Sequence, residues 1–151
     1  MDETVHEVFG VMLGIDVATA VPGLSADNKS YRRREQTALI CFAGALSGVC
    51  EISLSTPASV AVTSAMLGGT DVPEESEWIC DAVGELCNLL AGGWKNRLPA
   101  IGAECSLSQP TVIVGGEYQV HHPANLVVRR LSYSFGEEHL LQLTLVCDPS
   151  G

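Results

Sequence analysis

The stretch that decides the fold is EESEWICDAVGELCNLLAGGWKNRL, residues 74–98. Its apolar residues recur at intervals of three and four, which places them on one side of a helix at about 100° per residue. That side carries Ile79, Val83, Leu86, Leu90 and Trp94, with Ala82, Leu89 and Cys87 beside them. We therefore predict an amphipathic helix from about Glu74 to Arg97, buried on this side.

Strand patterns lie on both sides of this helix. Two pairs of apolar segments each flank a short turn and predict β-hairpins. They are residues 36–44 and 48–55 around Leu46-Ser47-Gly48, and residues 126–135 and 139–147 around Gly136-Glu137-Glu138. Two shorter strands are predicted between the long helix and the second hairpin, at 103–109 and 111–115.

Two further helices are predicted before the long one. Residues 2–20 carry Val5, Val8, Phe9, Met12 and Leu13 at helical spacing. Residues 56–69 begin with Thr56 as a cap and Pro57 in the first turn, and end at Gly68-Gly69, as a short helix does. The order of elements predicts an α+β fold with helices packed on an antiparallel sheet, rather than a doubly wound sheet.

The two helix-plus-hairpin segments resemble each other. Glu3, Glu7, Gly10 and Gly14 in the first helix have the same spacing as Asp81, Glu85, Asn88 and Gly92 in the long one. Each copy precedes a predicted hairpin. We therefore predict two pseudo-repeated halves that share one core, and a single domain over residues 1–151.

The composition excludes several classes of function. The formal net charge is -10, and the only basic run is Arg32-Arg33-Arg34, so nucleic acid is not an expected partner. No membrane or targeting segment is recognisable, which predicts a cytoplasmic protein. The cysteines and histidines lack the spacing of a zinc site, so no metal site is expected.

A polar stripe runs along the other side of the long helix. Asp81, Glu85, Asn88 and Gly92 cluster there, and Gly84 and Gly92 lie four residues before and after Asn88. Asparagine and glycine are poor choices for a helix interior, where they cost up to about 1 kcal/mol each. Two interpretations of the stripe remain open. It is either a solvated face or a functional strip, flat enough for another backbone to lie on.

The chemistry of such a strip is restricted. Carboxylates exposed on a convex helix lack the burial that tunes a general acid or base. No Ser/His or Cys/His pair stands at plausible spacing for a nucleophile. An asparagine amide, in contrast, donates to and accepts from a water, and so orients it for in-line attack. The neighbouring Glu85 would anchor a lysine on a partner.

The segment DAVGELCNLLAGGW resembles the signature helix of the CheC/CheX/FliY chemotaxis phosphatases, and the whole chain is most similar to the CheX type. In that family Asp or Ser is followed after three residues by Glu, after two more by Asn, and about 22 residues later by Pro. Here the residues are Asp81, Glu85, Asn88 and Pro110. QPTVIVGGEY is similar to the strand that follows.

The resemblance implies a phosphatase that removes the aspartyl phosphate of a CheY-type response regulator. Asn88 would orient the attacking water, and Glu85 would pair with the regulator's lysine. Asp81, Gly84 and Gly92 would contact the partner. The first helix, with Gly10 where Asn is required, would be catalytically silent.

The resemblance also implies that any magnesium belongs to the regulator, and that the chain forms a homodimer. The edge of the final hairpin is a candidate dimer interface. The alternative function is a non-catalytic module that binds a receiver domain or a flagellar-switch component through the same stripe. A buried small-molecule site has only scattered His and Cys to support it.

Overall fold

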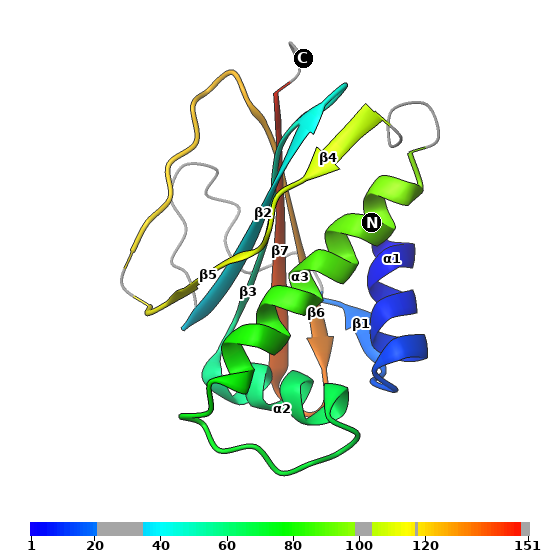
Figure 1. Cartoon of the computed structure of the whole chain (residues 1–151), viewed down its shortest axis with the longest axis vertical. Helices are drawn as coiled ribbons and strands as arrows, with labels where there is room; N and C mark the ends of the chain where they lie inside the picture. The colour runs from blue at the N-terminus through cyan, green and yellow to red at the C-terminus, as the bar shows by residue number, and fades with distance from the viewer. Residues whose placement is uncertain (21–34, 99–103, 117, 149–151) are drawn as a thin grey trace.

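A computed structural model describes residues 1–20, 35–98, 104–116 and 118–148. The helices lie against one antiparallel sheet, and the longest of them, α3 (Trp78–Asn96), crosses it diagonally (Figure 1). This arrangement confirms the predicted α+β class. The basic run Arg32-Arg33-Arg34 lies outside the described residues. In the parts of the chain that are described, no helix is long and apolar enough to cross a membrane.

Within the described residues the sheet has seven strands in the order β1-β6-β7-β3-β2-β4, and β5 also pairs with β2. The strands are β1 (Val17–Thr19), β2 (Gln36–Gly44), β3 (Ser47–Leu54), β4 (Cys105–Leu107), β5 (Thr111–Val114), β6 (Val127–Phe135) and β7 (His139–Asp148). The remaining helices are α1 (Asp2–His6), continued by the π-helix η1 (Glu7–Met12), and α2 (Thr56–Met66).

The two hairpins meet at the centre of the sheet. β3 pairs with β7 from Ser47↔Asp148 to Leu54↔Leu141, while β2 and β6 lie outside them. The strand after each long helical segment crosses to the other hairpin: β1 pairs with β6, and β4 and β5 pair with β2. The two halves therefore exchange strands within one sheet.

One continuous core lies between α3 and the sheet. The apolar side predicted for α3 is buried at Ile79, Val83, Leu86, Leu90, Ala82 and Cys87, whereas Leu89 and Trp94 are half-buried. Alternate residues of β2, β3 and β7 join the same core, as the two-residue repeat of a strand dictates. The amphipathic prediction for this helix is confirmed.

The first helix is shorter than the predicted range of residues 2–20. Its second half is a π-helix, in which the Leu13 amide donates to the Val8 carbonyl five residues earlier. The extra residue in the turn shifts the following side chains, so Met12 is exposed rather than buried. Gly14 then adopts φ 66°, and the chain continues into β1 instead of further helix.

Other boundaries differ by small amounts. Ser55, not Thr56, is the N-cap of α2, because its side chain accepts a hydrogen bond from the Ala58 amide. α3 begins at Trp78, one turn later than the predicted Glu74. The final hairpin is not an open edge along its length: β7 is internal, and the end of β6 nearest the turn pairs with β1.

A glycine sets the distance between the two helices that carry the repeat. A Cβ at Gly93 would lie 2.7 Å from Thr4 Cγ2 of α1, which is closer than non-bonded carbons approach, and Thr4 is fully buried. At the neighbouring Gly92 a Cβ would have nothing within 4 Å. Only Gly93 is therefore needed for the packing of α1 on α3.

These adjacent glycines give a matched test of that packing. Gly92→Ala should raise the free energy of unfolding by up to about 1 kcal/mol through helix propensity. Gly93→Ala should lower it, because overpacking costs about 1–3 kcal/mol and outweighs the same gain. Thermal and denaturant unfolding measure both variants. Equal stabilisation by the two alanines would show that α1 does not depend on the bare backbone of Gly93.

Candidate functional site

The site predicted on α3 lies on its solvent side. Burial of the opposite side fixes which residues face outward, and Asp81 and Glu85 are exposed while Asn88 is half-buried. Asn88 Nδ2 donates a hydrogen bond of 3.4 Å to Glu85 Oε2. The carboxylate and the carboxamide therefore lie side by side, one turn apart.

Gly84 does not form part of the open strip. It is buried, and a Cβ there would lie 3.4 Å from Val112 Cγ2 and 3.5 Å from Pro110 Cγ. The expectation that Gly84 offers accessible backbone to a partner is therefore wrong. Pro110 and β5 pack against α3 at Gly84, where they border the stripe on the Asn88 side.

Gly92 does have open backbone. It lies four residues after Asn88 on the same side of α3, and nothing stands within 4 Å of where its Cβ would be. Of the two glycines around Asn88, this is the one that leaves room for a second molecule. The accessible part of the stripe consists of Asp81, Glu85, Asn88 and Gly92, and we call it the α3 stripe.

The cysteine nearest in sequence to Asn88 is not a nucleophile for this surface. Cys87 is fully buried, and its Sγ lies 3.6 Å from the Ala38 carbonyl oxygen and 3.7 Å from that of Cys50. A hydrogen bond with the Cys50 side chain, together with burial, raises the pKa of the Cys87 thiol well above its ordinary range. The thiol therefore stays protonated in the core.

The described residues form no metal cage, and the larger of the described cavities lies away from the α3 stripe. Across the described residues no group of three or more His, Cys, Asp and Glu side chains stands close enough to hold an ion. A cavity of about 230 Å³ lies between Met1, Trp94 and the strands β6 and β7. It contains none of the residues of the stripe.

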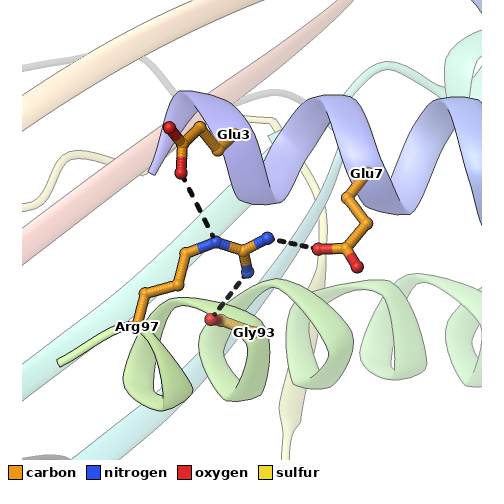
Figure 2. Close-up of polar contacts among 4 residues, drawn as sticks. All are labelled: Glu3, Glu7, Gly93 and Arg97. Carbon is orange, nitrogen blue, oxygen red and sulfur yellow. Dashed lines mark hydrogen bonds and ion pairs between the residues drawn. The ribbon is translucent and has the colours of Figure 1, made fainter. Parts of the chain in front are cut away.

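The first helix uses its equivalent carboxylates differently. Arg97, just after α3, forms ion pairs with Glu3 and Glu7 and donates a hydrogen bond of 3.0 Å to the Gly93 carbonyl (Figure 2). Glu3 and Glu7 correspond to Asp81 and Glu85 in the repeat. The carboxylates of the first helix are thus bound within the chain, while those of α3 face solvent.

The counterpart of Asn88 on the first helix is Gly10. It is exposed within the π-helix and has nothing within 4 Å of its Cβ position. This helix therefore lacks the carboxamide, and its neighbouring carboxylate is engaged by Arg97. Sequence spacing identified the missing carboxamide, but the ion pairs of Arg97 join residues too far apart in the sequence to be predicted.

The family model for chemotaxis phosphatase CheX matches residues 36–132, which contain all of α3 and the strands from β2 to β5. This chain belongs to the CheX family. The match includes Asp81, Glu85, Asn88 and Pro110 in one segment, and it begins after the first helix. The family resemblance inferred from the α3 motif is confirmed.

Similar proteins are found by sequence and by structure. The CheY-P phosphatase CheX of Thermotoga maritima is 28% identical over 117 residues, which span 78% of this chain and 74% of that protein. The crystal structure of CheX from Vibrio vulnificus superposes with a TM-score of 0.79 at 20% identity, covering 96% of this chain and 91% of that one.

Another CheX structure contains a second protein. The CheX-CheY-BeF3-Mg2+ complex from Borrelia burgdorferi has a TM-score of 0.75 at 17% identity, covering 96% of this chain and 93% of that chain. At these identities the likeness establishes the CheC/CheX-like fold. It confirms the predicted fold class, with helices packed on an antiparallel sheet.

Proposed function

We propose that this protein is a phosphatase that hydrolyses the aspartyl phosphate of a CheY-type receiver domain, with the α3 stripe inserted at the phosphorylated site. The observation that carries the proposal is the pair of Glu85 and Asn88, adjacent on an exposed helix face and hydrogen-bonded at 3.4 Å. The Thermotoga maritima relative, named a CheY-P phosphatase, supports the same activity.

Asn88 is proposed to orient the water. The water oxygen attacks phosphorus in line with the bond to the aspartyl oxygen, that P–O bond breaks, and inorganic phosphate and the aspartate carboxylate result. In the free protein one N–H of the Asn88 amide donates to Glu85. The amide oxygen and second N–H remain to hold a water, and positioning supplies much of the rate in phosphoryl transfer.

Glu85 is proposed to pair with a lysine of the receiver. Its carboxylate is exposed, and its bond to Asn88 is at the long end of the hydrogen-bond range, so a charged donor would readily replace it. Exchange of that bond would release the Asn88 amide toward the water. Asp81 and Gly92 are proposed as further contacts on the same stripe.

Magnesium is proposed to belong to the receiver domain. The Borrelia burgdorferi complex contains Mg2+ and BeF3 together with CheX and CheY. In this chain, the described residues hold no group of ligands for a cation. We also propose a homodimer, on the family resemblance alone.

Hydrolysis of a phosphorylated receiver tests the activity and the role of Asn88 together. The protein should accelerate loss of phosphate above the receiver's own rate, and Asn88→Ala should lower kcat about 100-fold, because the water loses its orientation. Unfolding curves would confirm that the fold is intact. Full activity in Asn88→Ala would place the water elsewhere, and absence of acceleration with several receivers would favour the non-catalytic binding module.

The ion pair of Glu85 should affect binding more than chemistry. Glu85→Gln keeps the shape of the side chain but removes its charge, so KM should rise about two- to fivefold at low salt, as expected for an exposed pair. The difference from the wild type should shrink at high salt through screening. A change in kcat without a change in KM would contradict this role.

Placing an asparagine at position 10 should not make the first helix active. In an Asn88→Ala background, Gly10→Asn should give no recovery of hydrolysis, because Glu7 is held by Arg97 and residue 10 lies in a π-helical turn. The steady-state rate of the double variant measures this directly. Recovery of the wild-type rate would show that a carboxamide alone is enough to make the first helix active.

A further inference from the structure

Trp78, the first residue of α3, is exposed in a way that the core does not explain. The residue is 55% exposed, and it is not among those that form or pack against the core. The second tryptophan differs: Trp94 is half-buried and lies against Phe42, with ring centroids 5.5 Å apart. Exposed tryptophan is uncommon on a surface that binds nothing and is enriched at binding hot spots.

Trp78 lies in line with the α3 stripe. It precedes Glu85 by seven residues, which is about 20° less than two full helical turns, so the two side chains leave α3 in nearly the same direction. Along the helix axis the two residues are about 10 Å apart. Asp81 stands between them and is also exposed. A molecule seated on Glu85 and Asn88 therefore extends over Trp78 if it covers two further turns toward the start of α3.

The charge around Trp78 indicates what kind of surface would cover it. Residues 71–94 contain no Lys or Arg, and their carboxylates are Asp71, Glu74, Glu75, Glu77, Asp81 and Glu85. All of them are exposed. An aromatic ring among exposed carboxylates, in a segment without Lys or Arg, suits a cationic side chain, which is attracted by both the ring face and the negative potential.

We propose that Trp78 is a docking residue that binds a basic patch of the phosphorylated receiver domain, outside the pocket that holds the phosphate. This rests on the proposed function and extends its interface beyond Glu85 and Asn88. Trp78 lies too far from Asn88 to touch the reacting atoms. Its contact therefore sets affinity and the choice among receivers, and leaves the hydrolytic step unchanged.

Kinetics of Trp78→Ala separate docking from chemistry. KM for the phosphorylated receiver should rise about 5- to 30-fold, the effect of truncating a hot-spot residue, with kcat unchanged. Trp78→Phe should recover part of the affinity, since phenylalanine keeps an aromatic face. Val127→Ala is the matched control, because Val127 is 56% exposed but lies on β6.

The contribution of charge is measured in the same assay. The triple variant Glu74→Gln/Glu75→Gln/Glu77→Gln should raise KM at low salt and flatten its dependence on salt. A receiver surface bound through apolar contact alone would leave KM and its salt dependence unchanged in this variant. That result would overturn the assignment of a basic patch.

A binding measurement distinguishes failure of this inference from failure of the proposed function. Calorimetry with a receiver held in its beryllofluoride and Mg2+ form gives Kd without hydrolysis. If the wild type binds but does not hydrolyse, the phosphatase proposal fails while a weaker Kd in Trp78→Ala still supports docking. Unchanged Kd and KM in Trp78→Ala would overturn the inference. The inference would also be overturned if Trp78→Ala became a monomer on sedimentation while its Kd for the receiver stayed unchanged, since Trp78 would then face a second copy of this chain.

Discussion

Burial of one side of α3 against the sheet is the contact on which the rest of the structure depends. Ile79, Val83 and Leu86 are in the core, and they leave the helix no freedom to rotate. The direction of Glu85 and Asn88 is therefore set by apolar packing on the far side of the same helix. A rigid element gives the precision that a site acting on another protein requires, because its geometry exists before the partner arrives.

The two halves of the repeat have diverged around one shared surface. Both present a helix with paired carboxylates, and both send a strand across to the other hairpin. In the first half the carboxylates at Glu3 and Glu7 bind Arg97, so they join the helices together. In the second half the equivalent groups remain available. Identical spacing thus has a structural use in one copy, and we propose a recognition use in the other.

The sequence predicts well what periodicity controls and poorly what distant contacts control. The apolar side of α3, both hairpins and the adjacency of Glu85 and Asn88 follow from spacing alone, since residues three or four apart share a helix face. The end of the first helix does not, because a π-turn and the pairing of β1 with β6 decide it. Gly84 illustrates the same limit: its wheel position places it near the stripe, but only the fold brings Pro110 over it.

The pairing of β3 with β7 has a consequence for synthesis of the protein. These neighbours at the middle of the sheet are separated by most of the chain, and β7 ends at Asp148. On the ribosome, β3 and α3 emerge long before β7. Until then one edge of β3 stays unpaired, and α3 lacks part of the sheet against which it packs. The α3 stripe is then assembled late, and the β3 edge is open to pairing with other chains until β7 covers it.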